Sequence, residues 1–188
     1  LTTSLGYDPG AFERTIYSAL IDDNVSMKEI IMGTKLPNLF FLPANLDLAG
    51  AEGELIGEIG WDRILKDALS PIERDYDFIL IDCPPSLGVL TTNALMATQR
   101  VIVPVQSEYL AMRGLKQLHT IITKVKKKGN PGLKLKILRT MHDLRTTHTR
   151  GVVEELERVF VNQIYQTVIK RTIKFADSAL AGEPILTY

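Results

Sequence analysis

The 188-residue sequence has a single cysteine, no excess of charge of either sign and no long apolar run. One cysteine cannot form an internal disulfide, which fits a reducing compartment. No apolar run approaches the ~18 residues of a membrane span, and no secretory pattern opens the chain. We therefore expect a cytoplasmic protein without a membrane partner. Lys plus Arg and Asp plus Glu each number 22. Bulk charge thus does not indicate a nucleic-acid binder, and any DNA contact must come from a local patch.

Short apolar runs alternate with stretches in which apolar residues recur at helical spacing. This alternation predicts an α/β fold with a doubly wound, mostly parallel sheet. Two runs, Phe78–Ile81 and Val101–Val103, are continuously apolar, as is typical of strands covered by helices on both faces. The predicted strands are Leu39–Leu42, Phe78–Asp82, Val101–Val105, Leu135–Leu138 and Tyr165–Ile169.

Helical spacing of apolar residues appears in three segments, Asp62–Arg74, Leu110–Val125 and Val152–Phe160. The second segment runs into a lysine cluster and then Gly129–Gly132, which is a helix stop signal and only secondarily a candidate nucleic-acid patch. The sequence contains no internal repeat and no linker, so we predict a single domain over residues 1–188.

Asp82 follows an apolar run directly, at the predicted carboxyl end of a buried strand. Open α/β sheets present their ligand sites at this edge. A carboxylate is costly to bury there unless it is paired or serves a metal, commonly through a coordinated water. The alternative is that Asp82 caps the helix that follows.

The two prolines after Asp82 favour the metal interpretation. Pro84 and Pro85 cannot continue the strand or start a helix at once, so they fix a stiff loop beside the carboxylate. Ser86–Gly88 then offers a pivot into a helix around Val89–Ala97. This is a plausible geometry for a loop that senses the γ-phosphate of a nucleoside triphosphate.

Several further short motifs follow one another at consistent spacing. They are Pro43–Ala44, Leu48–Glu52, Asp82–Gly88, Thr92–Leu95, Val103–Gln106 with Glu108–Tyr109, Thr140–Met141, Asp143, Arg145–Thr146 and Gly182–Ile185. Together they resemble the ParA/Soj family of deviant Walker-type partitioning ATPases over nearly the whole chain. The related MinD ATPases are less similar, because the Cys83–Gly88 turn has the partition-family form.

The resemblance implies a P-loop NTPase-like fold, ATP and Mg²⁺ as cofactors, and Asp82 as the catalytic residue that holds the metal. In the family, the phosphate loop with its two lysines precedes the position of Leu1, and a helix follows the position of Tyr188. No segment of the chain fits GxxxxGK followed by Ser or Thr. We therefore expect a domain incomplete at both ends, which neither binds nor hydrolyses ATP alone.

The resemblance also implies that ATP closes a homodimer, that the dimer binds DNA without sequence preference on the nucleoid, and that a centromere-binding ParB-like protein stimulates hydrolysis. The family's DNA-contact positions match Arg145 and Lys174, with Arg171 a neighbouring candidate. The alternative is that these cationic side chains lie at the solvent-exposed start of a helix and contact no DNA. The predicted nucleotide-binding residues are Pro84, Pro85, Met141, Asp143, Lys170 and Arg171.

Two segments depart from the family pattern. Lys170 stands where many relatives have a proline before the arginine near the adenine, and Ala176–Ser178 replaces a Ser-Glu-Ala run. Cys83 lies beside the phosphate site, but phosphoryl transfer to water needs no protein nucleophile, so we interpret it as a packing residue. Two other functions stay open: an ATPase that positions a protein cargo, and a non-catalytic interaction module.

Overall fold

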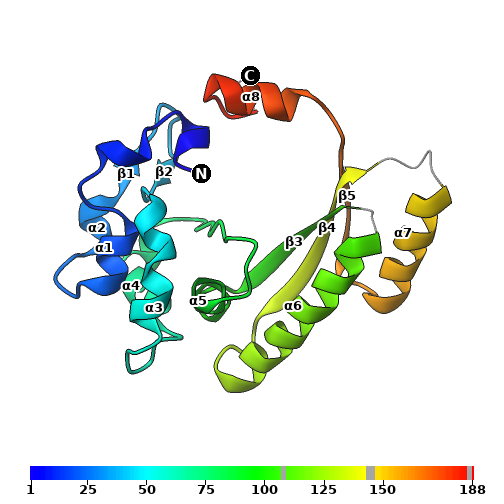
Figure 1. Ribbon diagram of the computed structural model, residues 1–188, viewed down its shortest axis with the longest axis horizontal. Helices are drawn as coiled ribbons and strands as arrows, with labels where there is room; N and C mark the ends of the chain where they lie inside the picture. The colour runs from blue at the N-terminus through cyan, green and yellow to red at the C-terminus, as the bar shows by residue number, and fades with distance from the viewer. Residues whose placement is uncertain (107–108, 143–146, 186–187) are drawn as a thin grey trace. The chain divides into compact units, whose positions relative to one another are not determined.

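The computed structural model describes residues 1–106, 109–142, 147–185 and 188. The chain divides into two compact units (Figure 1). One comprises Leu1–Ala97 with Lys174–Tyr188, and the other comprises Thr98–Ile173. No helix among the described residues has the length and apolar character needed to cross a membrane.

The unit of residues 98–173 contains three parallel strands, β3 (Arg100–Gln106), β4 (Lys134–His142) and β5 (Ile164–Lys170), in that order. The β3–β4 register pairs Arg100 with Lys134 and continues without a break to Gln106 and Thr140. The helices α6 (Tyr109–Lys128) and α7 (Thr147–Val159) connect the strands. Parallel strands need such crossovers, and the three strands and two helices predicted for this region are confirmed.

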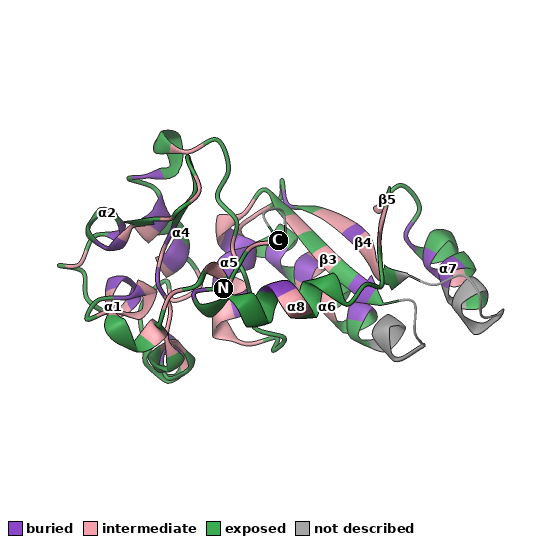
Figure 2. Cartoon of the chain, turned by 90° about the horizontal axis from the view of Figure 1, so that it is seen from above, coloured by how far each residue is buried: buried purple, intermediate pink, exposed green. Residues whose placement is uncertain are grey.

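One face of these strands packs against both helices. The core consists of Val105, Leu115, Ile137, Leu156 and Phe160. Burial alternates along β3 (Figure 2). Val105 is buried, while Ile102 on the other face is 46% exposed. Within this unit β3 therefore has one covered face, whereas the continuous apolar run had indicated two.

The unit of residues 1–97 and 174–188 is built from short elements. The helices are α1 (Ile16–Ile21), α2 (Met27–Ile30), α3 (Ala51–Leu55), α4 (Ile64–Leu69), α5 (Val89–Ala97) and α8 (Lys174–Ala181). Single 3₁₀ turns are η1 (Thr3–Leu5), η2 (Pro9–Ala11), η3 (Leu46–Ala49) and η4 (Glu73–Asp75). A small core joins α1 to α5, with Met27, Ile30, Ala51, Leu55, Leu69 and Ala94 among its buried residues. The helix predicted near 89–97 is confirmed as α5, whereas the one predicted at 62–74 ends as α4 before Pro71.

Two of the predicted strands differ in the structure. Leu39–Leu42 contributes only β2 (Phe40–Phe41), which pairs antiparallel with β1 (Met32–Gly33). Phe78–Asp82 forms no ladder among the described residues, so the prediction of a buried strand is wrong here. Phe78 and Leu80 are 86% and 85% exposed, while Ile81 packs on the core. A strand needs hydrogen-bonded neighbours as well as an apolar run, and the described residues supply none for this segment.

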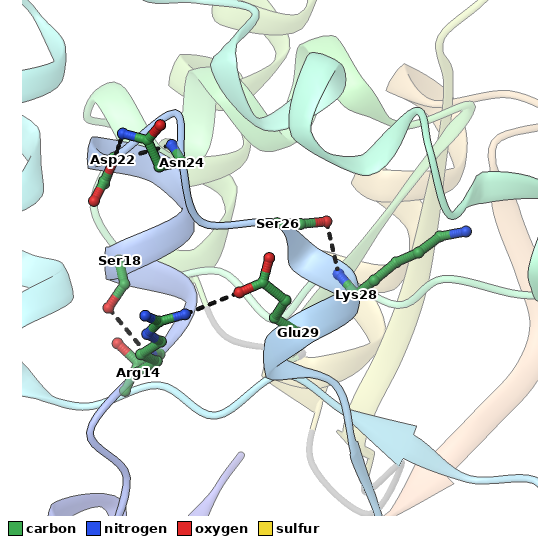
Figure 3. A network of polar contacts seen from close by, with 8 residues as sticks. Arg14, Ser18, Asp22, Asn24, Ser26, Lys28 and Glu29 are labelled. Atoms are coloured by element: carbon green, nitrogen blue, oxygen red, sulfur yellow. Dashed lines mark hydrogen bonds and ion pairs between the residues drawn. The ribbon is translucent and has the colours of Figure 1, made fainter.

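Local polar contacts set the start of α1 and α2 (Figure 3). Ser18 Oγ accepts a hydrogen bond from the backbone N–H of Thr15, and Ser26 Oγ accepts one from Lys28. The Arg14 guanidinium lies 2.9 Å from the Glu29 carboxylate and so links the segment before α1 to α2. Side-chain oxygens at these positions satisfy backbone N–H groups that have no partner inside the helix.

Asp22 fixes the turn between the two helices, because its carboxylate accepts two hydrogen bonds of 2.9 Å from Asn24, one from the backbone N–H and one from the side chain (Figure 3). These bonds, the backbone one foremost, hold the pKa of Asp22 below its usual value. They favour the ionised form of the carboxyl group.

Candidate nucleotide site at the Asp82 loop

Asp82 lies where the extended segment leaves the core. Ile81 packs on the hydrophobic cluster immediately before it. The Asp82 side chain is 68% exposed, and one of its oxygens lies 3.8 Å from the backbone nitrogen of Leu1. Packing of the preceding residue thus fixes the backbone while the carboxylate stays accessible to a ligand.

The loop that follows Asp82, from Cys83 to Gly88, is called the Asp82 loop below, and α5 holds its far end. Thr91 Oγ1 donates a hydrogen bond of 2.6 Å to the carbonyl of Ser86. Thr92 Oγ1 donates one of 3.0 Å to the carbonyl of Gly88. The two adjacent hydroxyls therefore anchor the segment that the sequence indicated as a pivot.

Asn93 connects α5 to the start of α4 and to the segment before it. Its side chain is 2% exposed, and its Oδ1 accepts a hydrogen bond of 3.1 Å from the backbone N–H of Leu65. Its Nδ2 donates to the carbonyls of Trp61 at 2.7 Å and Val89 at 3.2 Å. The oxygen and the nitrogen of this buried amide both have hydrogen-bond partners, so Asn93 holds α5, and with it the end of the Asp82 loop, to the rest of its unit.

Glu52 reaches the same region from α3. One of its carboxylate oxygens accepts a hydrogen bond of 3.2 Å from the backbone N–H of Leu90, in the first turn of α5. This contact could not be predicted from the sequence, because it spans 38 residues and depends on the fold.

The thiol of Cys83 is not activated by its surroundings. Partial burial of the sulfur, and secondarily the neighbouring Asp82 carboxylate, raise the pKa of the Cys83 thiol above its ordinary value. A raised pKa lowers the thiolate fraction, and the thiolate is the nucleophilic form. The raised pKa disfavours a nucleophilic role. Cys83 is an exposed residue, so its interpretation as a packing residue stays a prediction.

The predicted base-side residues lie in the other unit, at the carboxyl ends of β4 and β5. His142 is paired with Lys170 in the strand register, so Met141 and Lys170 end neighbouring strands. Met141 is exposed and has a φ of 48°, and the register is irregular between Arg139 and His142. A positive φ is uncommon for a residue other than glycine and often marks a site under functional constraint.

The remaining predicted residues are more scattered. Arg171 is exposed just after β5, and Lys174 is the exposed first residue of α8. Asp143 and Arg145 lie outside the described residues. Pro84 and Pro85 are exposed in the loop after Asp82. Within the described part of the chain, no group of three His, Cys, Asp or Glu side chains comes together as a metal cage.

An α/β chain with parallel strands and an exposed carboxylate before an anchored loop has the features of a nucleotide-binding protein. Comparison with known sequences agrees. The AAA domain family AAA_31 matches residues 1–135. The chain is 42% identical over its whole length to the sporulation initiation inhibitor protein Soj of Bacillus subtilis, of which it spans 74%. It is 41% identical over 99% of its length to the chromosome partitioning protein ParA of Myxococcus xanthus, of which it spans 66%.

A solved structure is similar as well. The cobyrinic acid a,c-diamide synthase from Mycobacterium smegmatis, with bound ADP and magnesium, superposes with a TM-score of 0.84 at 40% identity. The match covers 97% of this chain and 73% of that one. The chain belongs to the ParA/Soj group of the AAA_31 family, as its motifs predicted, and this is a family of ATPases.

Proposed function

We propose that this chain is the greater part of an ATPase domain that partitions DNA. The observation that carries the proposal is the Asp82 loop, in which an accessible carboxylate precedes a turn anchored to α5 by the Thr91 and Thr92 hydroxyls. Two relatives whose names refer to chromosome partitioning, 41% and 38% identical, support the assignment of the process.

Asp82 fits the metal side of such a site. Mg²⁺ is usually held by one or two carboxylates and keeps several waters, so one exposed carboxylate without a cage of further ligands is a suitable donor set. When bound, Mg²⁺ neutralises charge on the β- and γ-phosphates of ATP. The role of this chain is to hold the Asp82 carboxylate in place and to keep the Pro84–Pro85 loop stiff beside it.

We assign contact with the adenine base to Met141 and Lys170, at the carboxyl ends of β4 and β5, and to Asp143 and Arg171, which follow these strands in the sequence. Neighbouring parallel strands end at the same edge of their sheet, which supports a shared role for Met141 and Lys170. No phosphate-loop motif occurs within residues 1–188. We therefore propose that the single domain needs that loop from its parent chain, and that these residues alone do not turn over ATP.

We assign DNA contact to Arg145, Arg171 and Lys174 in an ATP-dependent homodimer, with a ParB-like protein as the stimulating partner. Non-specific binding of this kind comes from phosphate contacts and weakens steeply with salt. In a chain whose net charge is zero, a local cluster has to supply the attraction.

Charge reversal in the parent chain tests this assignment. Arg145→Glu and Lys174→Glu should each abolish retention of duplex DNA in the presence of ATP, with dimer formation unchanged in light scattering. Lys66→Glu, an exposed lysine on α4, is the matched control and should bind as the wild type does. In wild type, the slope of log affinity against log salt should be about −0.9 for each phosphate contacted.

The outcomes separate the three functions. Unchanged DNA retention in both charge reversals would remove these residues from the interface. ATP turnover without any DNA retention by the wild type would favour an ATPase that positions a protein cargo. Neither turnover nor retention would favour the non-catalytic interaction module.

A further inference from the structure

The helix α3 is firmly placed in its unit and carries Glu52 toward the Asp82 loop. Ala51 and Leu55 are 0% and 1% exposed, so one face of this short helix is completely buried. On its exposed side, Glu54 accepts a hydrogen bond of 3.0 Å from the hydroxyl of Tyr17 on α1. Glu52, next to the buried Ala51, therefore extends from a backbone that has little freedom to move.

The Glu52 carboxylate acts as a cap for α5 from a distant part of the sequence. It accepts its hydrogen bond from Leu90, whose N–H belongs to the first turn of α5 and has no partner inside the helix. A negative charge at this end of a helix is also favoured by the helix dipole.

Glycine at position 88 is explained by this carboxylate. Gly88 does not have the positive φ that would require glycine, unlike Gly6 and Gly182. A Cβ added to Gly88 would lie 2.8 Å from Cδ of Glu52, and even nearer to one of its oxygens. A side chain at position 88 and the Glu52 carboxylate in its present position exclude each other, although Glu52 could rotate away at the loss of its bond to Leu90.

We propose that Glu52 is a positioning residue for the Asp82 loop. It holds the junction of Gly88 and Leu90, so that the loop moves about a fixed end and returns the Asp82 carboxylate to one place. This role rests on the ATPase function proposed above. Glu52 acts through an acceptor oxygen and not through a proton, so a glutamine at this position should serve nearly as well.

The experiment uses the full-length parent chain with Glu52→Ala, Glu52→Gln and Gly88→Ala. Glu52→Ala should lower kcat for ATP hydrolysis about tenfold or more, because small misplacements of catalytic groups have large effects. KM for ATP should change less than kcat, since Glu52 itself bonds to the backbone of Leu90 and is not among the predicted nucleotide-binding residues. Glu52→Gln should restore most of the lost turnover, and Glu58→Ala, an exposed glutamate just beyond α3, is the control.

A double-mutant cycle tests the contact itself. Gly88→Ala should mimic Glu52→Ala, because it displaces the same carboxylate, and the combined variant should be no worse than either single one. Hydrogen exchange of the Leu90 amide should accelerate in all three and stay slow in Glu52→Gln. Full kcat in Glu52→Ala, a Glu52→Gln variant as impaired as the alanine variant, or additive losses in the cycle would each overturn the proposal.

If the proposed ATPase function is wrong, the experimental results differ from those that would refute the role of Glu52. The wild-type parent would then show no ATP turnover at all, whatever the residue at position 52. Protection of the Leu90 amide would still report whether Glu52 holds the junction, and an amide that exchanges equally fast in wild type and Glu52→Ala would refute the positioning role without any activity measurement.

Discussion

Replacing Asn93 by alanine removes three hydrogen bonds from one buried position and should destabilise the unit of residues 1–97 and 174–188. The amide connects α5 to the start of α4 and to the carbonyl of Trp61. In the alanine variant the backbone N–H of Leu65 has no intrahelical partner, because it lies in the first turn of α4. The Leu65 N–H cannot readily turn to water, since Leu65 is buried, whereas the carbonyl of the half-buried Trp61 can do so in part.

The expected loss follows from these orphaned groups. A buried donor or acceptor left without a partner costs about 1–3 kcal/mol, and here one donor and one acceptor lose their inter-element bonds. Allowing for partial relaxation, we expect the free energy of unfolding to fall by about 2–4 kcal/mol. The bond to Val89 lies within α5 and adds little, because that carbonyl can accept from its own helix.

The assay is urea unfolding followed by tryptophan fluorescence. Trp61 is the single tryptophan of the chain and its carbonyl is bonded to Asn93, so the probe reports on the affected region. Thr92→Ala is the control on the same helix. The carbonyl of Gly88, which accepts from the Thr92 hydroxyl, keeps its bond to the Thr92 N–H. The control should lose less than about 1 kcal/mol. Equal losses in the two variants would refute the reasoning.

Three further predictions concern single residues. Gly6→Ala should lower the free energy of unfolding by about 1–2 kcal/mol, because Gly6 has a φ of 82° and the new Cβ would lie 2.9 Å from the carbonyl oxygen of Gly182. Gly53→Ala is the control and should not destabilise the protein, because a Cβ at position 53 meets open space. Cys83 should react with iodoacetamide at pH 8 more slowly than in the denatured chain, because burial and the neighbouring carboxylate raise its pKa; an equal rate would contradict this. The pKa of Asp22, measured by NMR, should lie below its ordinary value of 3.8. The contribution of Asp22 to the free energy of unfolding is therefore present above pH 3.8 and is lost as the pH falls through the lowered pKa. A titration midpoint at or above 3.8 would contradict the turn geometry.

The sequence predicted the parallel strands of residues 98–173 well, because each apolar run there has its partners and crossover helices within the same stretch. Val101–Val105, Leu135–Leu138 and Tyr165–Ile169 all lie inside observed strands. The prediction was wrong for Phe78–Asp82. Its apolar composition is that of a central strand, but a ladder depends on neighbours that composition does not reveal, and Phe78 and Leu80 are exposed here.

The candidate site was predictable in part. Asp82 and the loop after it could be chosen from local sequence, since an apolar run, a carboxylate and two prolines are adjacent. The anchors could not, because Glu52 and Asn93 act across 38 and 28 residues or more and their partners are backbone groups. The closeness of Gly88 to Glu52 is likewise visible only in the fold.

The most direct test of the central claim is phosphate release from ATP by the parent chain, wild type against Asp82→Asn. If Asp82 holds the metal side of the site, the wild type should hydrolyse ATP only with Mg²⁺ present. The asparagine variant, which keeps the shape but loses the charge, should fall about tenfold or more, as is usual when a group that supports a metal is changed. Undiminished Mg²⁺-dependent release by Asp82→Asn would contradict the assignment of this loop as the metal site.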